Sequence, residues 1–230
     1  MDVATNVELP QILSVFTEEI TNRSGEVVDV FVKPSYVQAR SVLPRFAAAR
    51  PGDRLQAGVA LRAARGDVRV HPYLFRLVCR NGAILVEAAQ SQRLIEIELL
   101  EVPEAMAVLR QSIGACCAAE AFTEAMARVR DGAAVRDVHA IQMMPIMAHM
   151  ARRGSGFDPG EIWRRFLREA DPTPYGLANA ITSVARDTSD RRLRWDLEEL
   201  GGAVLTGDLG PQPHLSPQAA RATSVDGVLV

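Results

Sequence analysis

The sequence is poor in the residues that mark secreted and membrane-spanning proteins. It has three cysteines, Cys79, Cys116 and Cys117, with no CxxC spacing among them. An odd count with two adjacent cysteines argues against a disulfide framework, so we expect free thiols that pack as small apolar side chains. No apolar run reaches the roughly 18 residues of a membrane span, and the first residues lack the basic and apolar stretches of a secretory signal. These absences predict a cytoplasmic protein with no membrane partner.

Motifs of catalysis, metal binding and phosphate binding are missing as well. The four histidines are His71, His139, His149 and His214. None of them lies in a GxSxG-like nucleophile turn. No HExxH, HxxxH or CxxC pair supplies metal ligands, and no GxGxxG or GxxxxGKS/T loop is available for nucleotide phosphates. We therefore expect no enzymatic activity, no metal and no cofactor.

Lysine is nearly absent, since Lys33 is the single lysine beside 25 arginines. The whole chain has a net charge of −2, which does not indicate a nucleic-acid-binding protein by composition. The positive charge is concentrated, however, in residues 40–80, which hold nine arginines and two aspartates, a net charge of +7. This segment is the candidate for contact with an anionic partner.

Alternating apolar residues predict an antiparallel strand region over residues 25–100. Strands are expected at 28–33, 55–62, 68–70, 74–80 and 93–99. Residues 34–52 are predicted to be connecting structure with room for a short helix, and residues 64–67 to form a turn. Asn81-Gly82 fits a type I′ hairpin turn. Alternatively, this pair ends a strand and a helix follows over 83–90.

Apolar residues recur at helical spacing from Pro103 to Gly132, which predicts one long helix of about 40 Å. A second helix is expected over 134–152. Capping signals predict three later helix starts, at 158–161, at Thr173-Pro174 and at Ser189-Asp190.

The predicted fold is a single α+β domain over residues 1–205. In it, the N-terminal antiparallel strand region packs on a C-terminal helical half, residues 103–205, that contains the long helix. Residues 206–230 are rich in proline and glycine with little apolar pattern, which predicts a flexible tail.

Two segments resemble a known family. Residues 57–85, AGVALRAARGDVRVHPYLFRLVCRNGAIL, and residues 173–182, TPYGLANAIT, resemble two signatures of the phage/plasmid-like protein family known as domain of unknown function 932, in the same order and spacing. The matching positions here are Arg76, Cys79, Asn81, Gly82 and Asn179. The resemblance spans roughly residues 25–205. It implies a phage, prophage or plasmid context and implies no particular activity.

The chain departs from this family in the loop before the glycine turn. Family members often have Asn-Ser-Glu or His-Asp-Gly there, whereas this chain has Arg-Ala-Ala-Arg-Gly at residues 62–66. The expected strand at 93–99 holds Glu96 and Glu98, where family members commonly have basic or histidine residues. We therefore expect any polar chemistry that the family places in the loop at residues 62–66 to be absent from this chain.

The basic hairpin within residues 62–80 is the main functional candidate. We predict that its arginines project together from neighbouring strands and follow a phosphate backbone, while a tyrosine stacks on a base. The residues predicted to do this are Arg62, Arg65, Arg69, Arg76, Arg80 and Tyr73. The protein would be a mobile-element accessory protein that binds or anneals single-stranded DNA. The alternative is a non-enzymatic protein-interaction or oligomeric scaffold module, whose partner is a host protein or further copies of itself.

Overall fold

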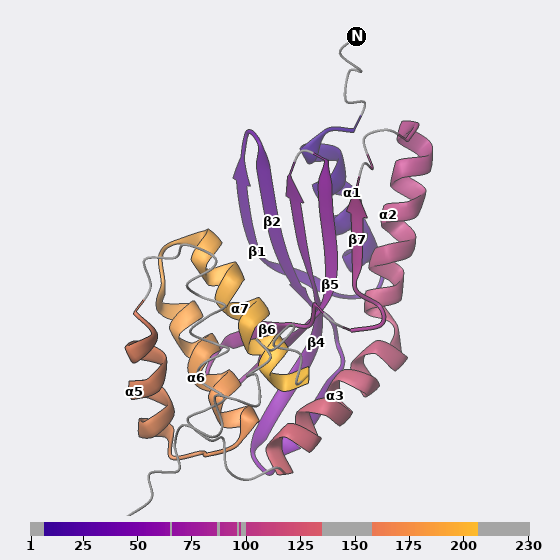
Figure 1. The fold of residues 1–230 in the computed structure, drawn as a ribbon. Helices are drawn as coiled ribbons and strands as arrows, with labels where there is room; N and C mark the ends of the chain where they lie inside the picture. The colour runs from indigo at the N-terminus through magenta and orange to yellow at the C-terminus, as the bar shows by residue number, and fades with distance from the viewer. Residues whose placement is uncertain are drawn as a thin grey trace, which may run out of the picture.

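The computed structural model describes residues 7–64, 66–86, 88–95, 97, 100–134 and 158–206. It confirms the α+β class, with a curled antiparallel sheet in the N-terminal half and helices in the C-terminal half (Figure 1). The strands are β1 (Glu26–Lys33), β2 (Tyr36–Val42), β3 (Phe46–Arg50), β4 (Asp53–Ala64), β5 (Asp67–Arg76), β6 (Asn81–Ile84) and β7 (Gln92–Ile95). Their order in the sheet is β1-β2-β4-β5-β6, with β3 paired to β4 and β7 paired to β5.

Residues 34–52, predicted to be connecting structure, contain the two strands β2 and β3. All seven residues of β2 are buried, including the polar Gln38, Arg40 and Ser41. A strand covered on both faces has no apolar–polar alternation, and its buried polar residues resemble a loop in the sequence. The prediction for this segment is therefore wrong.

The hairpin turn predicted at Asn81-Gly82 lies directly before that pair. Asn81 and Gly82 begin β6 and pair with Arg76 and Phe75 of β5, while residues 77–80 form the turn. Arg80 adopts the positive φ of 53° that the turn requires. The alternative helix over 83–90 is wrong as well, because its first residues belong to β6.

The long helix predicted from Pro103 to Gly132 is two helices, α2 (Val102–Cys117) and α3 (Ala119–Ala134). The break falls at Ala118, whose ψ of 150° is extended. Arg45 donates hydrogen bonds to the carbonyls of Cys117 and Ala118, at 3.0 and 3.1 Å, and so satisfies the freed end of α2. No proline or glycine marks this break, so the helical spacing continues through it.

The three capped helix starts are confirmed. The helices are α5 (Pro159–Glu169), α6 (Pro174–Asp187) and α7 (Arg191–Thr206). Asp158 accepts from the Gly160 amide and Thr173 from the Gly176 amide, and Asp190 accepts from the first turn of α7. The helix predicted over 134–152 falls, after Ala134, outside the described residues. The tail predicted at 206–230 does so after Thr206, the last residue of α7.

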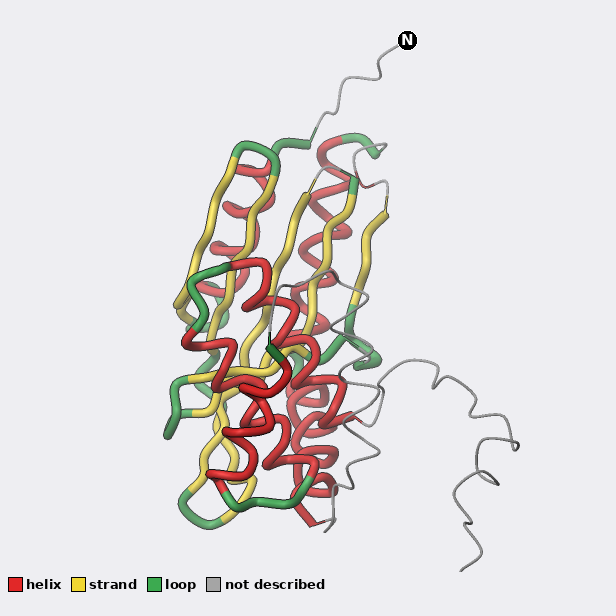
Figure 2. Tube along the Cα trace, turned by 60° about the vertical axis from the view of Figure 1, so that its left-hand side comes forward, coloured by secondary structure: helices red, strands yellow, loops and turns green. Residues whose placement is uncertain are grey.

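Helices cover the two faces of the sheet at different places. A further helix, α1 (Leu9–Thr21), lies with α2 behind the sheet in Figure 1, and α7 lies in front of its lower part, with α6 packed on α7 and α5 packed on α6. Figure 2 shows the same division from another side. We call these the α1 face and the α7 face. Val59 and Leu61 of β4 belong, with Phe16 of α1, to the main core, which we call the core of the α1 face, whereas Ala60, Tyr73 and Ile84 pack on Trp195 of α7.

The upper part of the α7 face carries none of the helices that the structure describes (Figure 1). Over the described residues, no helix combines the length and the apolar character that crossing a bilayer requires.

Candidate functional site

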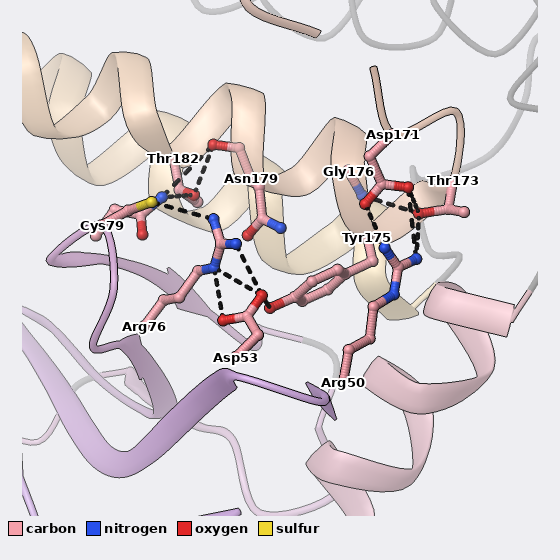
Figure 3. Close-up of polar contacts among 11 residues, drawn as sticks. Arg50, Asp53, Arg76, Cys79, Asp171, Thr173, Tyr175, Gly176, Asn179 and Thr182 are labelled. Atoms are coloured by element: carbon pink, nitrogen blue, oxygen red, sulfur yellow. Dashed lines mark hydrogen bonds and ion pairs between the residues drawn. The ribbon is translucent and has the colours of Figure 1, made fainter. Parts of the chain in front are cut away.

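The two segments that carry the family resemblance lie against each other. The turn from β5 to β6 brings Arg76 and Cys79 against α6, which carries Asn179 (Figure 3). Asn81 and Gly82, at the start of β6, line the same small cavity as Asn179. The Asn81 side-chain amide donates to the Thr182 hydroxyl at 2.7 Å and to the Asn179 backbone carbonyl at 3.5 Å. We call these five signature residues, together with the side chains they contact, the signature junction.

Arg76 is held in the signature junction by a carboxylate. Its Nε and Nη2 donate to the two oxygens of Asp53 at 2.9 and 2.7 Å, and Tyr175 Oη donates to the same carboxylate at 2.8 Å. Burial raises the pKa of Asp53, but the hydrogen bonds from Arg76 and Tyr175 outweigh it and leave this pKa below its ordinary value. Arg76 Nη1 also lies 3.2 Å from Cys79 Sγ. This guanidinium is therefore fully engaged within the protein.

A second arginine joins the same helix to the sheet. Arg50, at the end of β3, donates to Asp171 at 2.7 Å and to the Thr173 hydroxyl at 3.0 Å, and Thr173 caps α6 (Figure 3). The sequence pattern gave no sign of this contact, because its partners lie more than a hundred residues apart.

The signature junction is packed rather than open. Its remaining cavity is about 20 Å³, which is room for one water molecule at most. A Cβ at Gly82 would overlap the ring of Tyr73, so a close approach of the tyrosine explains the glycine. The signature residues therefore hold β5, β6 and α6 together, and they leave no space for a ligand.

Two of the predicted nucleic-acid contacts are wrong for this reason. Tyr73 is 1% exposed beneath Trp195, and a buried ring has no face free to stack on a base. Burial also raises the pKa of its hydroxyl. Arg76 already binds Asp53 in the signature junction, so contact with a phosphate would have to break that ion pair.

The remaining predicted residues fall in three places. Arg65 lies outside the described residues. Arg80 is exposed in the β5–β6 turn, at the far end of β5 from Arg69. Seven residues of extended strand separate positions 69 and 76, a distance of about 23 Å. The described members of the predicted cluster therefore do not form one surface, and among them only Arg62 and Arg69 stay together.

Arg62 and Arg69 are directly opposite each other on β4 and β5, and Arg93 of β7 is paired opposite Arg69. The side chains of Arg62 and Arg69 are 26% and 24% exposed on the α7 face, near the start of α7. Arg69 forms an ion pair with Asp67 at 2.8 Å, and Arg62 lies 3.8 Å from Asp196. Three arginine positions therefore follow one another across three neighbouring strands.

Cations from β1 and α7 extend this row. Lys33 and Arg191 lie over the ring of Phe31, at 5.5 and 6.0 Å from its centroid. Arg62 and Arg192 lie over the ring of Tyr36, at 5.3 and 5.6 Å. We call the resulting surface the cationic face; it consists of Lys33, Arg62, Arg69, Arg191 and Arg192. The sequence pattern did not predict the contribution of α7, whose arginines are far from the hairpin in the chain.

A buried ionic layer fixes α7 below the cationic face. Arg40, 1% exposed, donates to Glu198 at 2.6 Å and to Asp29 at 2.9 Å. Arg191 and Arg194 also pair with Asp29, at 2.9 and 3.5 Å. Since a buried arginine is tolerated only when it is paired, these contacts determine where the start of α7 lies on the sheet.

The described residues contain no group of three or more histidine, cysteine, aspartate or glutamate side chains that could hold a metal ion. Cys116 and Cys117 are buried free thiols, as the sequence predicted, and Cys79 is a partly buried one. Burial raises the pKa of the Cys117 thiol to about 11, which keeps it protonated and unreactive at neutral pH.

Comparisons with protein-family models, with curated proteins and with solved structures found no match for this chain. The resemblance of residues 57–85 and 173–182 to the phage/plasmid-like family therefore stays a prediction.

Proposed function

We propose that this protein binds single-stranded nucleic acid through the cationic face. The observation that carries the proposal is the placement of Arg62 directly opposite Arg69. Like charges facing each other across a sheet destabilise it, and a polyanion that lies along them would remove that repulsion. Both guanidinium groups remain partly exposed although each is ion-paired, Arg62 with Asp196 and Arg69 with Asp67.

The composition of the cationic face favours a single strand over a duplex. Lys33 and Arg191 cover the ring of Phe31, and Arg192 lies on Tyr36 in the same way. Guanidinium planes that rest on aromatic rings are surfaces on which unpaired bases stack. A duplex offers its phosphates alone to such a surface. Among the described residues, the ion pairs of this face involve Asp29, Asp67 and Asp196.

The wider role we propose is that of an accessory protein of a phage or plasmid. It rests on the resemblance of the two signature segments, which the fold brings together through Asn81 and Thr182. No catalytic step is part of the proposal, because binding or annealing of single strands needs only charge and stacking.

The test is fluorescence anisotropy with a labelled oligothymidylate at several salt concentrations. Each neutralised phosphate contributes about −0.7 to the slope of log K against log salt. The double variant Arg62→Ala/Arg69→Ala should therefore weaken binding at low salt and reduce the size of the slope by about 1.4. The matched control is Arg128→Ala/Arg164→Ala, which removes two ion-paired surface arginines on α3 and α5.

Wild-type protein that fails to bind at micromolar concentrations and low salt would end the proposal. An equal loss of affinity in the control variant would show that only general positive charge matters. Equal affinity for a duplex of the same length would contradict the preference for single strands.

A further inference from the structure

β1 is an edge strand with an unusual exposed side. Among the described strands it pairs with β2 alone. Its Val28, Val30 and Val32 are 45%, 44% and 56% exposed. Val30 and Val32 stand opposite Ala39 and Val37 of β2, which belong to the core of the α1 face. These two valines therefore lie on the α1 face, at its margin, where α1 leaves them uncovered.

Exposed edges of this kind attract further strands. Soluble proteins protect their sheet edges with prolines, inward charges, bulges or covering loops, because an unpaired edge is a template for another strand. β1 has a bulge between Val27 and Asp29 and a lysine at its end. The stretch from Asp29 to Lys33 is regular and contains no protecting proline. It is thus able to accept one more antiparallel strand.

We propose that the strand it accepts is β1 of a second copy of this chain, in an antiparallel pair centred on Phe31. This register uses the whole regular stretch that follows the bulge. It places Asp29 opposite the partner's Lys33, Val30 opposite the partner's Val32, and Phe31 opposite the partner's Phe31. The sequence is therefore complementary to itself in charge and in apolar character.

The valines and the charges contribute differently to this pairing. Residues that stand directly opposite in a sheet lie on the same face, so Val30 and Val32 of both copies form one apolar strip. Asp29 already accepts hydrogen bonds from Arg40 and Arg191, so a further cation adds little energy. The lysine then selects the register, and the valines supply the burial.

Pairing about a two-fold axis perpendicular to the sheet leaves equivalent faces on the same side. The cationic faces of the two copies would then lie side by side on one continuous sheet. A stable protein interface commonly buries about 800 Å² on each partner, and a five-residue strand pair is smaller than that. We therefore expect a weak dimer, with a dissociation constant on the order of micromolar.

Sedimentation velocity without nucleic acid tests the proposal independently of the proposed function. From about 1 to about 200 µM, the wild type should shift from monomer to dimer. Val30→Glu/Val32→Glu places charges on the exposed strip and should raise the dissociation constant at least tenfold. The control Val78→Glu changes a valine that is 64% exposed in the β5–β6 turn and should leave dimerisation unchanged. A wild type that stays monomeric throughout, or a dimer that the double variant retains, would overturn the proposal.

Engineered disulfides test the register. Val30→Cys protein mixed with Val32→Cys protein should form a cross-linked dimer under mild oxidation, because opposite residues bring their Cα atoms about 5.5 Å apart. Each variant alone should cross-link poorly, and wild-type protein provides the background from Cys79. Val30→Cys protein that cross-links with itself faster than the mixture does would contradict the pairing centred on Phe31.

Discussion

Arg69 and Arg76 stand on the same strand, yet their surroundings differ in every respect that bears on function. Arg76 binds Asp53 through two nitrogens, beside the Tyr175 hydroxyl and the Cys79 sulfur. Arg69 pairs with Asp67, two residues away on the same strand, and faces another arginine across the sheet. One end of β5 is a closed junction, and the other end is an open surface.

This difference separates residues that a sequence pattern treats alike. At the signature junction, Arg76 binds Asp53 of β4 and lies over the Tyr175 ring of α6, and the remaining cavity is too small for a ligand. On the cationic face, Arg62 and Arg69 pair with Asp196 and Asp67, and their side chains stay partly exposed. Arginine that is enclosed and bidentate supports the fold, whereas arginine aligned with other arginines at a surface is available to an anion.

The largest expected effect on stability comes from adding a side-chain atom where α7 packs closely on β6. In Gly202→Ala, the new Cβ of α7 would overlap the Ile84 carbonyl of β6. Backbone cannot rotate away as a side chain can, so we expect the free energy of unfolding to fall by at least about 3 kcal/mol, measured by urea denaturation.

Gly114→Ala is the matched control, because this glycine also lies within a helix. A Cβ there meets only the end of the Arg23 side chain, at 3.2 Å. Removing a glycine from a helix interior usually stabilises it by up to about 1 kcal/mol. A loss in the control as large as that of Gly202→Ala would show that close packing of α7 on β6 is not the cause.

The next largest effect is a pH dependence of stability caused by His71, which lies on β5 between Arg69 and Arg76. This side chain is 3% exposed beneath α7. Burial lowers its pKa from 6.5 to about 4, with Arg69 acting in the same direction and with Glu199 and Asp67 opposing it. The folded protein therefore favours the neutral imidazole, and the stability this gives is complete above pH 6.5 and is lost as the pH falls towards 4. We expect a loss of about 2–3 kcal/mol across this window.

Urea denaturation at a series of pH values measures this loss. In His71→Leu the decrease between pH 6.5 and about 4 should be smaller by the same amount. Asp187, whose pKa the hydrogen bond from Arg186 lowers to about 2, acts below this window, and so does Asp53. An unchanged pH profile in the variant would mean that His71 does not titrate as its burial implies.

The smallest effect contrasts the two arginines directly. Arg76→Met leaves the Asp53 carboxylate without its cation, so we expect a loss of about 2 kcal/mol in unfolding free energy and no change in affinity for oligothymidylate. Arg69→Met should do the reverse: it should leave stability within about 0.5 kcal/mol of wild type and weaken binding at low salt. If both variants lost stability alone, the distinction between the two ends of β5 would not hold.

Local signals in the sequence predicted the later helices well. Asp158, Thr173 and Asp190 each cap a helix through a side chain that lies within three residues of the amide it binds. Alternating apolar residues in β4 and β5 identified the central hairpin for the same reason, because successive side chains of a strand point to opposite faces of the sheet. These features depend on contacts between residues close in the chain, and a pattern can reveal them.

The failures share the opposite property. β2 has no alternation because α7 and α1 bury both its faces, and the end of α2 is satisfied by Arg45 from the distant β2–β3 connection. Position 73 holds an aromatic residue that looked available for stacking, but Trp195 covers it. Each of these three failures depended on at least one element more than fifty residues away in the sequence.

By itself, the sequence determined the α+β class, the caps of α5, α6 and α7, and the concentration of arginine in residues 40–80, because propensity, capping and charge act over a few residues. Tertiary structure alone decided which of those arginines face water. The packing of α6 on the β5–β6 turn enclosed Arg76, and the buried ion pairs of Arg40 set α7 beside Arg62. Whether a side chain is buried depends on surfaces that meet only after the chain has folded, so a local sequence pattern cannot predict it.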